Sequence, residues 1–101
     1  MLHPDIELSD RRELPREQVI RLYQECGWSS AEKPDRLLAA LANSDTIISA
    51  WQADDLIGLG NAISDGALVV YYPHLLVRPA FQKQGVGQQI LWVVWLGQRR
   101  Q

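Results

Sequence analysis

The sequence predicts a single α/β (α+β) domain with a mainly antiparallel sheet. Three extended segments rich in branched residues follow one another between short turns, which is typical of an antiparallel meander. Two segments before them carry apolar residues at helical spacing, and helix-forming residues come after them. A chain of 101 residues that is 47% hydrophobic has room for one compact domain, residues 1–101, and not for two.

The amino-terminal part predicts one strand and two helices. Residues 6–8 alternate in polarity and form the first predicted strand. From Pro15 onward the apolar residues recur at helical spacing, and Gly27 stands just past the end of this helix. Residues 33–35 open a second helix after a loop at 28–32. Its predicted buried stripe is Leu37, Leu38, Leu41 and Ala42.

The three extended segments span residues 46–52, 56–64 and 67–77, with turns at 53–55 and 65–66. Pro73 interrupts the last of them. Because proline has no N–H to donate to a ladder, it sits at sheet edges or bulges. We therefore expect either a bulge that interrupts this strand near Pro73 or an edge strand that the proline merely blunts.

Charge and cysteine content exclude several classes of function. The formal net charge of −2 gives no basis for a nucleic-acid partner, which needs a clustered basic face. Cys26 is the only cysteine, so no internal disulfide forms, and we expect a cytoplasmic protein. No apolar run approaches the length of a membrane span, so no membrane association is predicted. No metal site is predicted either.

Residues 75–91 are the most informative stretch, because an apolar strand leads through a loop into a helix. Gly85 and Gly87 in this loop lack a Cβ, so the backbone can approach a ligand closely. The free N–H groups and the positive end of the helix dipole suit a phosphate or pyrophosphate. Two glycines at this spacing more often serve the geometry of a turn, and neither nucleotide fingerprint, Rossmann or P-loop, is present.

Residues 82–87, Gln-Lys-Gln-Gly-Val-Gly, follow Leu-Leu-Val-Arg-Pro-Ala-Phe at 75–81. Together they resemble the acetyl-CoA-binding signature of the GNAT superfamily of N-acetyltransferases, Gln/Arg-x-x-Gly-x-Gly/Ala after a strand ending in Val-x-Pro-x-Phe/Tyr. The resemblance implies a GNAT-like mixed sheet, mainly antiparallel, with helices on both faces. It also implies transfer of an acetyl group from acetyl-CoA to an amine of a small molecule or peptide.

The same resemblance assigns cofactor contacts and indicates a departure. It implies that pantetheine lies against the backbone of Leu75, Leu76 and Val77. It places the pyrophosphate at the loop formed by Gln82, Lys83, Gln84, Gly85, Val86, Gly87 and Gln88. The last strands of a GNAT domain have no counterpart after residue 91, so we expect a C-terminally shortened domain. Trp28 would line the acceptor side, with a core-capping role as the alternative.

Tyr71 and His74 are the candidates for a catalytic base. The resemblance places Tyr71 where some family members carry an acid or base, although a phenol with a pKa near ~10 is a poor base. His74 has an ordinary pKa near ~6.5, but strand alternation puts it on the opposite face from Tyr71 unless a bulge at Pro73 changes the parity. The alternative is that Tyr71 is a core aromatic and His74 a packed strand residue.

Residues 90–96, Ile-Leu-Trp-Val-Val-Trp-Leu, form an unbroken apolar run. A solvent-facing helix would show polar residues on its far side, so this run is either buried on all sides, by a second copy of the chain for example, or partly a strand. A homodimer in which Trp92 and Trp95 meet the partner is the expected assembly. Loss of catalysis would leave a non-catalytic acyl-CoA-binding or oligomerisation module.

Overall fold

The computed structural model describes residues 5–99, and it contains the predicted strands and helices in the predicted order. The elements are β1 (Ile6–Ser9), α1 (Arg16–Glu25), a 3₁₀ turn (Ser29–Glu32), α2 (Pro34–Ala42), β2 (Thr46–Gln52), β3 (Asp55–Ser64), β4 (Val70–Tyr71), β5 (Leu75–Val77), a 3₁₀ turn (Pro79–Phe81) and α3 (Val86–Arg99). Within residues 5–99, no strand follows α3.

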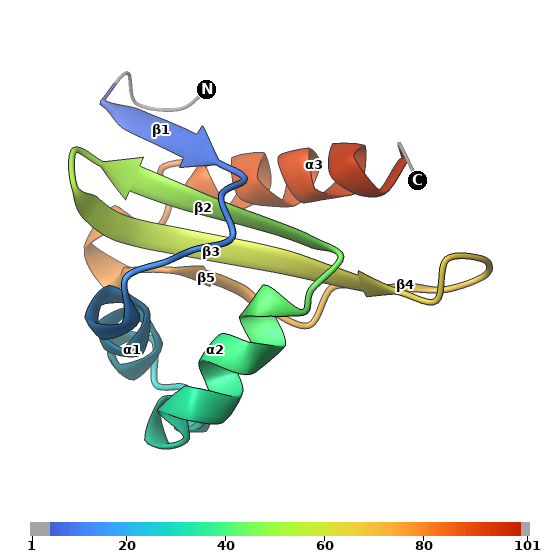
Figure 1. Ribbon diagram of the computed structural model, residues 1–101. Helices are drawn as coiled ribbons and strands as arrows, with labels where there is room; N and C mark the ends of the chain where they lie inside the picture. The colour runs from blue at the N-terminus through green and yellow to red at the C-terminus, as the bar shows by residue number, and fades with distance from the viewer. Residues whose placement is uncertain (1–4, 100–101) are drawn as a thin grey trace.

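The strands form one antiparallel sheet in which β3 is central (Figure 1). β1 pairs with β2 and β2 with β3, while β4 and β5 both pair with the other side of β3. The third predicted strand, 67–77, is therefore two short strands, interrupted at Pro73 as expected. Residues 67–69 belong instead to the hairpin turn, where the carboxylate of Asp65 accepts hydrogen bonds from their N–H groups.

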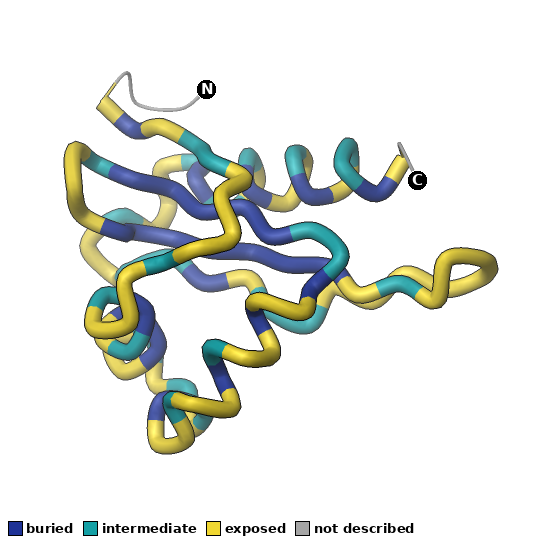
Figure 2. Tube along the Cα trace, in the orientation of Figure 1, coloured by how far each residue is buried: buried dark blue, intermediate teal, exposed yellow. Residues whose placement is uncertain are grey.

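Helices cover both faces of this sheet, so the predicted fold class is confirmed (Figure 1). Side chains alternate along β2, which sends Ile47 into the core beneath α1 and α2 and Ile48 into the core beneath α3. Most residues of β2 and β3 are buried, on both faces of the sheet (Figure 2). In α2, Leu37 and Leu41 are buried, but Ala42 is exposed because it lies at the last position of the helix, beyond the packed face.

α3 lies unusually close to β3 because two glycines of that strand face it. A Cβ added at Gly60 would lie 2.6 Å from Ile90 Cγ2, and one added at Gly58 would lie 2.9 Å from Ile90 Cδ1. Ile90 is fully buried. A bulge in β3 opposite Ala50 and Trp51 puts Ile57 in the same core as Ile90. Because Gly58 and Gly60 have no side chains, β3 leaves room for Ile90, and α3 packs directly on the strand.

The apolar run 90–96 is helical throughout, so the strand alternative is wrong. Ile90 and Val94 point to the sheet and are buried, whereas Leu91, Trp92 and Trp95 are exposed. The rings of Trp92 and Trp95 stack with their centroids 5.0 Å apart. Complete burial within one chain is also wrong, because the described residues cover only one side of α3.

We expect Gly60→Ala to lower the free energy of unfolding by about 1–3 kcal/mol, because its Cβ would overlap Ile90. Ile90→Ala removes the overlapping atoms at the cost of a cavity. Urea unfolding of both single variants and of the double variant forms a thermodynamic cycle. The substitution at Gly60 should cost less in the Ile90→Ala background, and strictly additive effects would show that this contact does not position α3.

Candidate active site

The break between β4 and β5 is a β-bulge. Tyr71 pairs with Ile63, and Leu75 pairs with Gly60. The chain therefore advances four residues from Tyr71 to Leu75 while β3 advances three, so the segment between β4 and β5 contains one extra residue. His74, the residue before Leu75, lies opposite Asn61 of β3, and the Asn61 N–H donates to the His74 carbonyl oxygen. Because paired residues share a face, the extra residue changes the parity and points both Tyr71 and His74 to the α1–α2 side.

β5 presents an open edge on the side away from β3. The Arg78 N–H donates to the Ile57 carbonyl oxygen of β3 at 2.8 Å, and the carbonyl of His74 also faces β3. Hydrogen bonding alternates along an antiparallel strand, so the N–H groups of Leu75 and Val77 point to the open edge. Within residues 5–99, no strand lies beyond this edge.

A hollow of about 520 Å³ lies between this edge and the start of α3. Its walls are Leu75, Val77, Gln82, Lys83, Gly85, Gly87 and Gln88. These seven residues all belong to the set that the signature assigned to the cofactor, so the structure brings the strand part and the loop part of that set together. Leu76 is excluded from the hollow because its side chain is buried in the core on the opposite face of the sheet.

The loop before α3 leaves backbone donors free. The first intrahelical bond runs from the Gln89 N–H to the Gly85 carbonyl oxygen at 3.1 Å. The N–H groups of Val86, Gly87 and Gln88 therefore have no intrahelical acceptor. Gly85 has φ +83°, a backbone conformation that glycine adopts without steric cost. These donors and the positive end of a 14-residue helix favour an anion here.

The carbonyl oxygen of Val77 accepts two hydrogen bonds from side chains. The side chain of Gln82 donates to it at 2.9 Å, and the thiol of Cys26 donates at 3.3 Å. The Gln82 amide thus holds the loop against β5. Burial raises the pKa of the Cys26 thiol, and the neighbouring Glu25 adds to this shift. Cys26 is therefore a packed thiol and not an activated nucleophile.

His74 lies on the α1 side of the same strand, next to two aromatic residues. The hydroxyl of Tyr23 is 2.6 Å from His74 Nδ1, and the ring centroids of His74 and Trp28 are 4.9 Å apart. Tyr23 is fully buried, and its burial raises the pKa of the phenol far above its ordinary value. Burial also lowers the pKa of His74. At neutral pH both groups are therefore uncharged.

A chain of hydrogen bonds holds the backbone of His74. The Ser44 hydroxyl donates to the Ala40 carbonyl oxygen at 3.0 Å, so its oxygen accepts from the Asn61 side-chain amide at 2.9 Å. The Asn61 amide oxygen then faces the His74 N–H at 3.0 Å. Sequence reasoning missed Tyr23 and Asn61 as parts of the site. An asparagine inside the apolar run 56–63 was the available signal, since a buried amide needs partners.

The structure separates Tyr71 from this cluster. Tyr71 is 63% exposed on the hairpin that projects beyond the sheet (Figure 1), so the core-aromatic interpretation is wrong. Trp28 is partly buried, packs edge-on against Tyr23 and lines a separate hollow with the 3₁₀ turn that follows α1. In that turn the Ser30 hydroxyl is buried without a hydrogen-bond partner among the described residues. The structure therefore brings His74 together with Trp28, but not with Tyr71.

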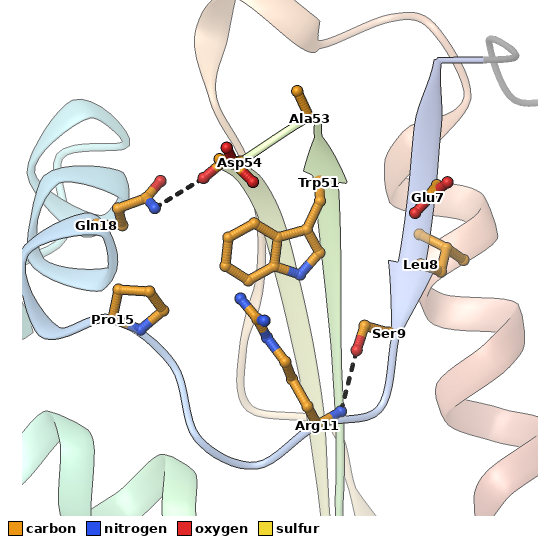
Figure 3. A pocket seen from close by; sticks show the side chains of 9 residues that line it. All are labelled: Glu7, Leu8, Ser9, Arg11, Pro15, Gln18, Trp51, Ala53 and Asp54. Atoms are coloured by element: carbon orange, nitrogen blue, oxygen red, sulfur yellow. Dashed lines mark hydrogen bonds between the residues drawn. The ribbon is translucent and has the colours of Figure 1, made fainter.

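A further hollow lies at the far edge of the sheet, away from β5 (Figure 3). The Arg11 guanidinium lies 3.9 Å from the centroid of the Trp51 ring. Gln18 uses its amide to bridge the Asp54 carbonyl oxygen and the Leu56 N–H. The indole N–H of Trp51 donates to Ser49. The Gln18 amide and the Trp51 indole N–H thus have their hydrogen-bond partners within the protein.

Two kinds of structure are not found in the described part of the chain. No group of three or more His, Cys, Asp and Glu side chains among residues 5–99 is placed to hold a metal ion. No helix among the same residues is long and apolar enough to cross a membrane.

No protein-family model and no curated protein matches the sequence. Solved structures do match. A GNAT-family acetyltransferase from Streptococcus pneumoniae is 29% identical, with a TM-score of 0.78 over 91% of this chain and 67% of that one. An acetyltransferase from Streptococcus agalactiae is 14% identical, with a TM-score of 0.77 over 97% of this chain and 68% of that one.

A third match is the PaiA N-acetyltransferase from Thermoplasma acidophilum, in complex with coenzyme A. It is 16% identical, with a TM-score of 0.73 over 94% of this chain and 73% of that one. The chain thus spans 67% to 73% of the length of these three structures. The order of elements, the bulged strand and the glycine-bearing turn together show that the chain has the fold of the GNAT N-acetyltransferases.

Proposed function

We propose that the protein is an N-acetyltransferase that transfers the acetyl group of acetyl-CoA to an amine of a small molecule or peptide. The observation that carries this proposal is the hollow between the open edge of β5 and the free N–H groups of α3. It combines a strand edge that can hydrogen-bond an extended amide chain with an anion site. Pantetheine and pyrophosphate have these two chemistries, and both belong to one molecule.

In this proposal each part of acetyl-CoA has its own contacts. The pyrophosphate accepts hydrogen bonds from the backbone at residues 84–88, and the exposed Lys83 adds positive charge nearby. Pantetheine lies along the open edge and bonds the outward N–H group of Val77. The thioester then lies near the bulge at Pro73, where the outward N–H group of Leu75 can stabilise the oxyanion of the tetrahedral intermediate.

The acceptor amine approaches from the other side of β5, where His74 and Trp28 lie. Its nitrogen must be neutral to attack the thioester carbon, so it loses a proton before or during the attack. A tryptophan face next to the site favours an acceptor that carries positive charge elsewhere in the molecule. The free thiol of Cys26 is consistent with a cytoplasmic location, which is part of the proposal.

The second candidate is a non-catalytic acyl-CoA-binding module. It uses the same hollow, so binding alone does not separate the two functions. Release of free CoA thiol over a panel of amines does, because only the enzyme breaks the thioester. Amine-dependent release supports the acetyltransferase, and binding without release supports the module.

We expect Gly87→Val to weaken CoA binding by more than about tenfold, because the branched side chain would fill the hollow where the pyrophosphate lies. The fold should tolerate the change, since a Cβ at Gly87 meets only Val77 Cγ2, at 3.6 Å. Isothermal titration calorimetry with acetyl-CoA and with CoA measures the affinity of the wild type and the variant.

Ala39→Val is the matched control, because Ala39 is exposed on α2, far from the hollow, and also acquires a branched side chain in a helix. It should bind CoA like the wild type. Equal affinities for Gly87→Val and the control, with both proteins folded by circular dichroism, would contradict the assignment of the hollow to the pyrophosphate.

We also propose that two copies of the chain associate through α3. The exposed Leu91, Trp92 and Trp95 adjoin Tyr72 and Gln88 around an apolar groove of about 470 Å³. Monomeric proteins rarely leave a contiguous apolar patch of this kind uncovered. A two-fold axis would cover this patch, since the same patch then faces itself, and it would leave the open edge of β5 to the cofactor.

Sedimentation equilibrium at micromolar concentration tests this assembly. The wild type should be a dimer, and Trp92→Glu should be a monomer, because burying an unpaired carboxylate against the partner is costly. Ala39→Glu introduces the same charge on the exposed side of α2 and should remain dimeric. A well-folded, monomeric wild type would refute the dimer.

A further inference from the structure

The hydrogen bond between Tyr23 and His74 has only one chemically consistent direction. A phenol has one proton to donate, and the fully buried Tyr23 hydroxyl finds no acceptor among residues 5–99 other than His74 Nδ1, at 2.6 Å. Leaving a buried O–H without an acceptor costs about 1–3 kcal/mol. The hydroxyl therefore donates, and Nδ1 accepts.

The direction of this bond decides where the proton of the imidazole resides. A neutral imidazole carries one N–H, and a nitrogen that accepts a hydrogen bond carries none. With Nδ1 as the acceptor, the proton lies on Nε2. No described residue accepts a hydrogen bond from Nε2, so this donor remains available. In this state Nε2 has no lone pair with which to take a proton from an amine.

The position of the ring is fixed as firmly as its tautomer. Asn61 contacts the His74 backbone on both sides, through its amide oxygen and through its own N–H. Trp28 and Tyr23 contact the ring edge-on. The next residue, Leu75, directs its backbone N–H to the open edge of β5. A side-chain donor and a backbone donor thus follow each other at the bulge.

We propose that Tyr23 is a positioning residue that fixes His74 in the Nε2–H tautomer, so that His74 stabilises the negative charge that develops on the transferring acetyl group instead of acting as a general base. This inference rests on the proposed acetyl transfer, and it replaces the role of base that the sequence suggested for His74.

In the reaction, the amine nitrogen attacks the thioester carbonyl carbon and forms the C–N bond, while the carbonyl electron pair moves to oxygen. The oxyanion accepts hydrogen bonds from His74 Nε2–H and from a backbone N–H of β5. When the carbonyl re-forms, the C–S bond breaks and the thiolate leaves. The proton lost by the amine passes through water to the thiolate, which gives CoA thiol and the amide. His74 keeps its proton throughout.

Nitrogen NMR of the imidazole ring tests the tautomer without any need for activity. His3 is the only other histidine, so a His3→Gln background leaves one imidazole to observe. Long-range ¹H–¹⁵N spectra at neutral pH should show a protonated Nε2 and an unprotonated Nδ1. Tyr23→Phe removes one oxygen and keeps the ring, and it should shift the two resonances toward an average of both tautomers. A proton on Nδ1, or unchanged resonances in Tyr23→Phe, would overturn the proposal.

Three replacements of His74 test its role. A glutamine amide can place an N–H where Nε2 lies, whereas an asparagine amide reaches only the position of Nδ1. We expect His74→Ala and His74→Asn to lower kcat by about 10²-fold and His74→Gln to stay within about tenfold of the wild type. A glutamine variant as inactive as the alanine variant would return His74 to the role of base.

Two controls keep the outcomes separate. The pair Tyr23→Phe with His74→Gln removes the phenol that loses its acceptor in the single glutamine variant, so a folding defect there is relieved. If the wild type binds acetyl-CoA but releases no thiol with any amine, the proposed function fails, and the role of the donor fails with it. The NMR result on the tautomer does not depend on that outcome.

Discussion

The contact of Ile90 with Gly58 and Gly60 is the constraint on which the rest of the structure depends. A helix that packs on a strand with side chains stands off by the thickness of those side chains, whereas α3 lies against bare backbone. This close approach sets the height of the first turn of α3 relative to β5. The same contact therefore helps to place the start of α3 beside the hollow, where the free N–H groups of the helix and the strand edge face each other.

The bulge at Pro73 has a comparable effect on the other side of β5. Without the extra residue His74 would point toward α3, and its ring would compete for space with Ile90. With it, His74 faces α1 and meets Tyr23 and Trp28. One strand thus carries the hollow beside the start of α3 on one face and a polar aromatic cluster on the other, with an open edge between them.

The sequence predicted the elements well, because each has a local cause. Pro15 precedes the first helix, Gly27 follows it with φ +75°, and the turn at 65–66 is closed by the Asp65 side chain. The loop before the last helix was also predicted, since a glycine at positive φ, here Gly85, and a following helix are local properties. The alternative that residues 90–96 are partly a strand was wrong. This run is helical because Ile90 packs on the sheet, although its opposite side carries no polar residues.

The sequence by itself determined the order of elements, the fold class and the glycine-bearing turn before the last helix, because these follow from short-range propensity and spacing. Only the tertiary structure decided which side chains meet across distance. Tyr23 and His74 are far apart in the chain, and their contact requires α1 to pack over β5 at the bulge. The parity of His74 depends on pairing with β3, which no local pattern specifies. The exposure of Trp92 and Trp95 likewise follows from which face of α3 the sheet occupies.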